Sequence, residues 1–401
     1  MFKAQLLIIF SLLAPALSAQ TQPVSMAQAI QTALAKNPRT QANNLRLQSA
    51  YQSLQSSKIS LFSPTVSVGY NADTNFKSNI VQSGSASVSL NLFNGLSDYY
   101  RVKAQECNYK KLEAVYNSTT AMSQNSNGQI AGLVSNYFIN LVNIRESLLF
   151  TENNLKKLNA LSPFIKTSEQ KVILSNAIQS AQINIDELKS KLEIAESNYE
   201  FAVNDQVPVH LDSLLETIVH ITIPIDASMA SGISLEKSPE ILSSRLNIEC
   251  MKLSHKATKG QAYGFRADLR AGVNTTFNGT TTPGASISIS KTIGFGTRSN
   301  LKSEQDLIHA AEFDLEGTIA EVKNTLKNNY IQLKSALTSA QSYEQGYNQN
   351  NQQFDDLMKK GAQLTDEEIT VALSLISSYQ SQWQLMNYKL QEVINIKFQI
   401  Q

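Results

Sequence analysis

An internal repeat with one constant offset constrains this chain more than any other feature of its sequence. The stretch ALAKNPRTQANNLRLQ around Pro38 resembles SLEKSPEILSSRLNIE around Pro239, 201 residues further on. The same offset places Gly95 against Gly296. Because an offset kept over about sixty positions is hard to obtain by chance, the chain is predicted to be a duplicated structural unit.

Each unit is expected to contain the same parts in the same order. A helix from Ser25 to Lys36 should end at Asn37, because the residue before a proline is disfavoured in the α conformation. A second helix should then run to about Phe62. The predicted boundaries are residues 20–203 for the first repeat, 204–232 for the inter-repeat segment and 233–401 for the second repeat.

Alternation of apolar and polar residues predicts one β-hairpin in each unit. The first covers about residues 65–93, where SVSLNLFNG ends at Gly95. The second covers about residues 266–294, where SISISKTIGFG ends at Gly296. Each strand has about ten residues, the length of a tilted transmembrane β-strand, and each hairpin has one apolar and one polar face.

Four strands cannot close a barrel, and open sheet edges are not tolerated in lipid. Three copies of the chain would supply about twelve strands, enough to surround a channel. The expected fold is therefore an α+β membrane protein whose trimer shares a 12-stranded barrel. Four side chains on the polar faces are candidate lumen residues: Asp73, Asp268, Arg270 and Asn274.

After each hairpin the apolar residues recur in steps of three and four, as between Leu141 and Leu158. This spacing is typical of heptad seams between partner helices. We expect a long helical hairpin over about residues 95–203 and another over about 296–401, with the first arm unbroken from Gly95 to about Lys171. Helices of that length need partners along their course, as in a coiled-coil helical barrel.

The turn of the second helical hairpin carries signals for both a helix end and a helix start. In LMKKGAQLTDEEIT, Gly361 suits the left-handed end of a helix, and Thr365 with Glu368 forms a capping box. The first hairpin lacks the glycine and the acid, and Ser175 is its candidate N-cap.

Two interpretations of the acidic tip are open. Copies of Asp366, Glu367 and Glu368 from three chains could form a ring that narrows and filters an entrance. Alternatively, Glu368 only caps its helix, and the other two acids only favour a helix N-terminus through the dipole.

Composition and spacing argue against catalysis and against nucleic-acid binding. A formal net charge of +1 with 17% charged residues provides no basic face. The four histidines, His210, His220, His255 and His309, have no metal-ligand spacing. The stretch GFGTRS lacks the third glycine and the lysine of phosphate-binding loops. We therefore expect no enzyme, cofactor or metal site.

Residues 1–19 are expected to be a signal peptide, because Lys3 precedes an apolar run and ALSAQ suits cleavage after Ala19. The mature chain would then enter an oxidising compartment. Cys107 and Cys250 are expected to be two small buried side chains rather than a disulfide, because nothing in the sequence places their Cβ atoms close together.

The order of these parts resembles the TolC-like outer-membrane efflux proteins over essentially the whole mature chain. The resemblance rests on the exported chain, the repeated helix–Asn/Ser-Pro–helix opening, the hairpins ending at FNG and GFG, and the long helical hairpins. It implies a homotrimer in the outer membrane of a Gram-negative bacterium, with its barrel in lipid and its helical barrel in the periplasm. The inter-repeat segment would belong to an equatorial collar.

The resemblance also implies partners: a periplasmic adaptor protein and an inner-membrane pump. In that family the hairpin tips form the periplasmic aperture and contact the adaptor, and the matching positions here are Gly361, Thr365, Glu368 and Ser175. The function expected is a passive exit duct of a tripartite efflux or type I secretion system, whose cargo is chosen largely by the pump. The alternative is an exported coiled-coil scaffold or adhesin that conducts nothing, which would have no need for lipid-length strands.

Overall fold

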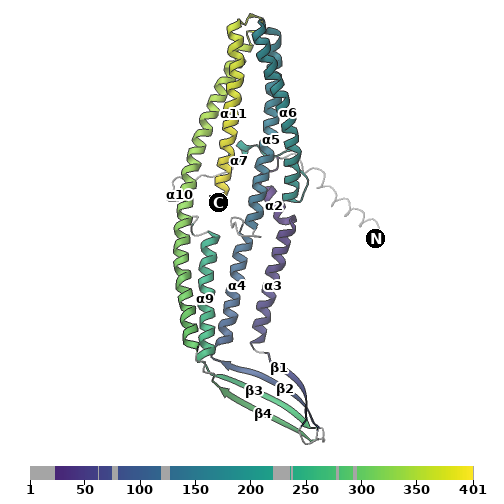
Figure 1. Ribbon diagram of the computed structural model, residues 1–401, viewed down its shortest axis with the longest axis vertical. Helices are drawn as coiled ribbons and strands as arrows, with labels where there is room; N and C mark the ends of the chain where they lie inside the picture. The colour runs from purple at the N-terminus through teal and green to yellow at the C-terminus, as the bar shows by residue number, and fades with distance from the viewer. Residues whose placement is uncertain are drawn as a thin grey trace, which may run out of the picture. The chain divides into compact units, whose positions relative to one another are not determined.

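A computed structural model describes residues 23–61, 63–74, 80–118, 127–219, 235, 238–276, 280–291 and 296–400 (Figure 1). The expected signal peptide lies outside these residues. Contacts divide the chain into two compact units, and each unit combines segments of both sequence repeats. The first contains Met1–Gln41, Ser118–Leu235 and Val322–Gln401, and the second contains Ala42–Asn117 and Glu236–Glu321.

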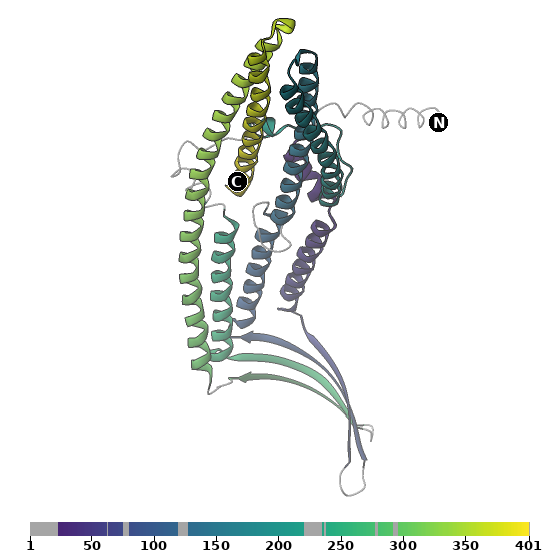
Figure 2. The same ribbon diagram turned by 45° about the horizontal axis from the view of Figure 1, so that its top comes forward.

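The second unit contains a four-stranded antiparallel sheet in the order β1-β2-β3-β4. Its strands are β1 (Thr65–Thr74), β2 (Ile80–Asn94), β3 (Arg266–Thr276) and β4 (Thr281–Ser290). The two predicted hairpins are thus present, and the central β2–β3 pairing joins one repeat to the other (Figure 2).

The register of the sheet separates an apolar face from a polar face. Leu90 of β2 pairs with Leu269 of β3, which in turn pairs with Ile287 of β4. The apolar face is open, since Val68 is 82% exposed and Ile289 is 73% exposed. A bulge at Leu92 interrupts the β2–β3 register. An apolar sheet face without cover in the chain itself needs an apolar environment or a partner.

Helices of the second unit precede or follow these strands along the chain. Its helices are α4 (Ser97–Asn117), α9 (Pro239–Tyr263), most of α3 (Pro38–Ser60) and the first part of α10 (Thr297–Met358). Helices α4 and α9 lie side by side and antiparallel (Figures 1 and 2). The prediction of one unbroken helix from Gly95 to Lys171 is wrong. Helix α4 ends at Asn117, and the next described helix, α5 (Asn127–Leu161), ends at Leu161 because Pro163 disfavours continuation.

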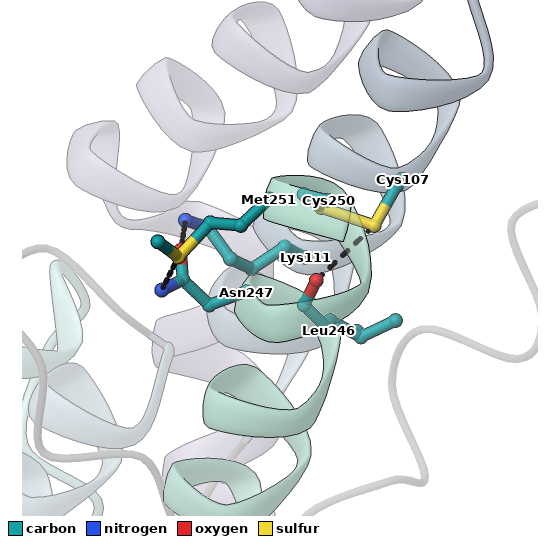
Figure 3. The surroundings of a disulfide bond; sticks show 6 residues. All are labelled: Cys107, Lys111, Leu246, Asn247, Cys250 and Met251. Atoms are coloured by element: carbon teal, nitrogen blue, oxygen red, sulfur yellow. Dashed lines mark hydrogen bonds between the residues drawn. A yellow bond between two sulfur atoms is a disulfide. The ribbon is translucent and has the colours of Figure 1, made fainter. Parts of the chain in front are cut away.

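The two cysteines form a disulfide, and the expectation that they stay unpaired is wrong. Cys107 of α4 and Cys250 of α9 have Cα atoms 5.4 Å apart, within the range for a disulfide (Figure 3). Next to the bond, Lys111 Nζ donates a hydrogen bond of 3.0 Å to Asn247 Oδ1. The pairing depends on the packing of helices that are 143 residues apart in sequence, which local spacing does not reveal.

Three glycines let the strand-to-helix turn after β2 approach the end of α9. Gly95 has a left-handed φ of 67°, and a Cβ there would lie 2.3 Å from the Gly260 carbonyl oxygen. A Cβ on Gly260 would lie 2.5 Å from the Gly95 oxygen, and one on Gly264 would lie 2.4 Å from the Gly95 Cα. These contacts are between backbones, so a larger residue at any of the three positions would displace the main chain.

The first unit is helical. Its helices are α2 (Met26–Lys36), α5 (Asn127–Leu161), α6 (Ser168–Val203), α7 (Leu214–Val219), α11 (Asp366–Ile400) and the second part of α10, with short 3-10 turns at Ser162–Phe164 and Gly361–Gln363. Phe138, Leu141 and Tyr199 are fully buried in its core. None of the helices in the described ranges combines the length and apolar composition needed to cross a membrane.

The described part of the inter-repeat segment is fixed to α5 by polar contacts. Arg145 Nη1 donates 3.0 Å to the Pro208 carbonyl oxygen, and the Leu214 N–H donates 3.0 Å to Glu146 Oε1. Burial raises the pKa of Glu146, although the Leu214 hydrogen bond opposes the shift. The ionised carboxylate is therefore destabilised in the folded chain at neutral pH.

Gly260→Ala should destabilise the second unit by about 2 kcal/mol or more, because the new methyl group meets backbone. Gly317→Ala is the matched control, since Gly317 is exposed in α10 with open space around its Cα, and it should stabilise by about 0.5–1 kcal/mol. Thermal unfolding of both variants measures the difference. Equal stability of the two variants would contradict the close backbone contact between Gly95 and Gly260.

Glu146→Gln should raise the unfolding temperature at pH 7, because it keeps an acceptor for the Leu214 N–H and removes a partly buried charge. The folded-state pKa is raised, so the wild-type penalty is absent below the ordinary value of 4.5 and grows as the pH rises. The gain should therefore disappear at pH 4. Exposed Glu193→Gln serves as the control, and a gain that is the same at both pH values would contradict the assignment.

Candidate functional site at the helical tips

The turn between α10 and α11 has the geometry that its sequence predicts. Gly361 has a left-handed φ of 53° after the end of α10. The Glu368 N–H donates 3.2 Å to Thr365 Oγ1, and the Thr365 N–H donates 2.9 Å to Glu368 Oε2. These reciprocal bonds form the predicted capping box, so α11 begins at a fixed point.

Glu368 is also paired with Lys360, which ends the preceding turn. The Lys360 ammonium group, together with the Thr365 N–H, holds the pKa of Glu368 below its ordinary value. This carboxylate is therefore ionised at neutral pH and is committed to holding the turn.

Helix α6, which follows the turn after α5, begins earlier in the sequence than predicted. Thr167 is the N-cap of α6: the Gln170 N–H donates 3.2 Å to Thr167 Oγ1, and the Thr167 N–H donates 3.4 Å to Gln170 Oε1. Ser175 lies exposed inside α6, so its prediction as the N-cap is wrong. The signal that identifies the true cap is the sequence TSEQ, a capping box in which glutamine replaces glutamate.

The two turns bond directly to each other within the first unit. Lys166 Nζ donates 3.1 Å to the Leu364 carbonyl oxygen and lies 4.0 Å from an Asp366 carboxylate oxygen. Gln170, which is 5% exposed, donates from Nε2 to the Asp366 carbonyl oxygen over 2.9 Å. We call these contacts of Lys166 and Gln170 with the start of α11 the tip latch.

The three predicted tip acids differ in their surroundings. Glu368 is engaged by Lys360, and Asp366 lies beside Lys166. Glu367 is exposed and has no ion pair within 4.0 Å among the described residues. Glu367 is therefore the acid of this tip whose charge is least compensated within one chain.

An aromatic cluster packs the two helical hairpins together beyond their turns. Phe354 and Tyr379 are buried, and Lys157 Nζ lies 5.1 Å and 5.0 Å from their ring centroids. Phe150 stacks on Trp383 with centroids 4.1 Å apart. Burial raises the pKa of the Tyr379 hydroxyl. A packed cluster of this kind holds α5, α10 and α11 together below the two turns.

The candidate lumen residues lie on the sheet of the second unit. Asp268 and Arg270 pair with Asn91 and Ser89 on the polar face, and Asp268 accepts a 2.7 Å bond from Arg266 Nε. Asn274 shares that face, and its carbonyl oxygen accepts from Thr282 Oγ1 over 3.3 Å. Asp73 pairs with Val81 through its backbone, and its side chain lies outside the described residues. In the described ranges, histidine, cysteine and acidic residues do not gather into a metal-binding group.

Comparison with known proteins identifies solved structures that share this architecture. No protein-family model matches the chain, and no curated protein matches it. Solved structures do match over nearly its whole length, at 12–14% identity. The open state of the Neisseria gonorrhoeae MtrE outer membrane channel is similar with a TM-score of 0.71, 13% identity, and coverage of 94% of this chain and 88% of that one.

The chain has the TolC-like fold. The outer membrane protein VceC of Vibrio cholerae is similar with a TM-score of 0.64, 14% identity, and coverage of 93% of this chain and 96% of that one. The Campylobacter jejuni CmeC outer membrane channel is similar with a TM-score of 0.62, 13% identity, and coverage of 96% and 90%. The resemblance that the order of sequence parts indicates is thereby confirmed for the fold.

Thr167→Ala and Thr365→Ala should each weaken the start of their helix by about 1 kcal/mol, because each loses an N-cap. Hydrogen exchange of the amides in the first turns of α6 and α11 should accelerate roughly fivefold. Ser175→Ala is the control and should leave both rates unchanged, since Ser175 lies in the helix interior. Faster exchange in the control alone would contradict the observed caps.

Proposed function

We propose that three copies of this chain form an exit duct in the outer membrane of a Gram-negative bacterium. The observation that carries the proposal is the four-stranded sheet with one exposed apolar face, one polar face and two outer strands, β1 and β4. Twelve strands from three copies would close a barrel with apolar residues toward lipid and polar residues toward the lumen. The similar solved structures described as outer membrane channels support this reading.

The long helices would assemble as a coiled-coil barrel in the periplasm. Inner-membrane pump and periplasmic adaptor proteins would be the partners, and export through the duct would be passive, in a tripartite efflux or type I secretion system. The protein would carry out no chemical reaction. Energy would come from the pump, and the pump would choose the cargo.

The helical tips would act as the gate of the duct. The tip latch supports this role because it joins the two turns of one chain through a lysine and a buried glutamine. These bonds hold the start of α11 against the turn before α6. Docking of an adaptor would replace the latch bonds with bonds to the partner, and the tips could then separate.

The purified full-length protein should produce discrete single-channel currents in a planar bilayer, small in the closed state. Lys166→Ala with Gln170→Met should increase the conductance, because this double variant removes the latch bonds and places an apolar side chain of similar size at position 170. The variant also removes the cap bond from the Thr167 N–H to Gln170, so Thr167→Ala, which weakens the same capping box and keeps the latch, should leave the conductance unchanged. Lys359→Ala is the matched control, since Lys359, in the turn after α10, pairs with Asp356 near the end of α10 and takes no part in the latch. A protein that inserts into no bilayer would favour the scaffold alternative.

An acidic ring at the entrance should make the channel prefer cations. Among single substitutions of the three tip acids, Glu367→Gln should reduce that preference most, because the other two acids lie beside Lys166 and Lys360. Asp366→Ala with Glu367→Ala should reduce it further. Reversal potentials in a salt gradient provide the measurement, and unchanged selectivity in both variants would show that the acids serve only the start of α11.

A further inference from the structure

The disulfide between Cys107 and Cys250 occupies a special position in the topology of the chain. Hairpins β1–β2 and β3–β4 each join neighbouring segments, whereas β2–β3 joins segments that are far apart in sequence. Asn94 of β2 pairs with Arg266 of β3, 172 residues later. Helix α4 follows β2 and helix α9 precedes β3, and the disulfide links these two helices (Figure 3).

The bond shortens the connection that the central strands must close. Asn94 lies 13 residues before Cys107, and Arg266 lies 16 residues after Cys250. A path through the disulfide is therefore 29 residues long instead of 172. Because the probability of closing a flexible loop falls with about the 3/2 power of its length, this change favours β2–β3 encounter roughly tenfold.

Burial restricts when the bond can form. Cys107 is 4% exposed and Cys250 is 6% exposed, because α4 and α9 pack over both. A protein oxidant needs direct access to a thiolate, since exchange proceeds through a mixed disulfide. Access exists only before the two helices have docked. The chain contains two cysteines in all, so each has one intramolecular partner.

We propose that this disulfide forms before α4 and α9 dock, by exchange with a protein disulfide donor, and that it directs the pairing of β2 with β3. The thiolate of one cysteine attacks the donor disulfide and forms a mixed disulfide. The second thiolate then displaces the donor, which leaves as a dithiol. The two electrons and, through solvent, the two thiol protons pass to the donor sulfurs, which gives the donor dithiol. This inference does not rest on the channel function, because it needs only the sheet and the two helices.

Refolding of the full-length chain from urea into detergent micelles tests the effect on the sheet. Pulsed hydrogen exchange with mass spectrometry follows protection in peptides from β2 and β3. The oxidised wild-type chain should protect these peptides roughly tenfold faster than Cys107→Ala/Cys250→Ala. Peptides from α5 in the first unit are the internal control and should be protected at the same rate in both. Equal rates at β2 and β3 would overturn the proposal.

A second experiment uses the wild-type chain alone and needs no refolding without the bond. The oxidised chain is first folded in micelles and then reduced with a small phosphine, or it is reduced and kept unfolded in urea, and the oxidised form of a thioredoxin-fold thiol oxidase is added to each. Alkylation and mass measurement then count the remaining thiols. The unfolded chain should be oxidised, and the folded chain should retain its thiols. Oxidation of both at one rate would overturn the proposed order of events.

Discussion

The constraint on which the rest of this structure depends is a four-stranded sheet with two outer strands and one exposed apolar face. Among the described residues, β1 pairs only with β2 and β4 pairs only with β3, so each outer strand leaves one edge of backbone donors and acceptors without strand partners. The same sheet exposes an apolar face that includes Val68 and Ile289. Lipid could cover that face, but lipid offers no hydrogen bonds for the edges. Other copies of the chain could satisfy the edges, and the proposed trimer follows from both needs together.

Each unit is held together internally by a different kind of contact. In the second unit, backbone contact among Gly95, Gly260 and Gly264 holds the strand-to-helix turn close to the end of α9, and the disulfide links α4 and α9 further along. In the first unit, two capping boxes fix where α6 and α11 begin, and the tip latch joins these starts. Rigid helix ends joined by a few polar bonds suit an element with two positions, since such bonds can be exchanged for bonds to a partner.

Local signals made part of this fold predictable from sequence. Alternation located both hairpins, and Thr365 with Glu368 located the start of α11, because each depends on residues close in sequence. Ser175 is a poor guide to the start of α6, because a lone serine also occurs inside helices, whereas Thr167 with Gln170 forms a complete capping box. The disulfide and the close contact of Gly95 with Gly260 and Gly264 depend on how α4 and α9 pack. The tip latch joins Lys166 to Leu364, 198 positions away. Such contacts leave no periodic pattern in the sequence.

Closure of the barrel between copies is the central claim, and cysteine crosslinking of the two outer strands tests it most directly. Ser67→Cys in β1 would be combined in turn with Ser286→Cys, Ser288→Cys or Ser290→Cys in β4, all on the polar face. The account predicts that at least one combination yields an oxidised ladder of one, two and three chains that ends at three. Val66→Cys, on the apolar face, should not crosslink with the same positions. A ladder that ends at two chains, continues beyond three or never forms would contradict the trimeric barrel.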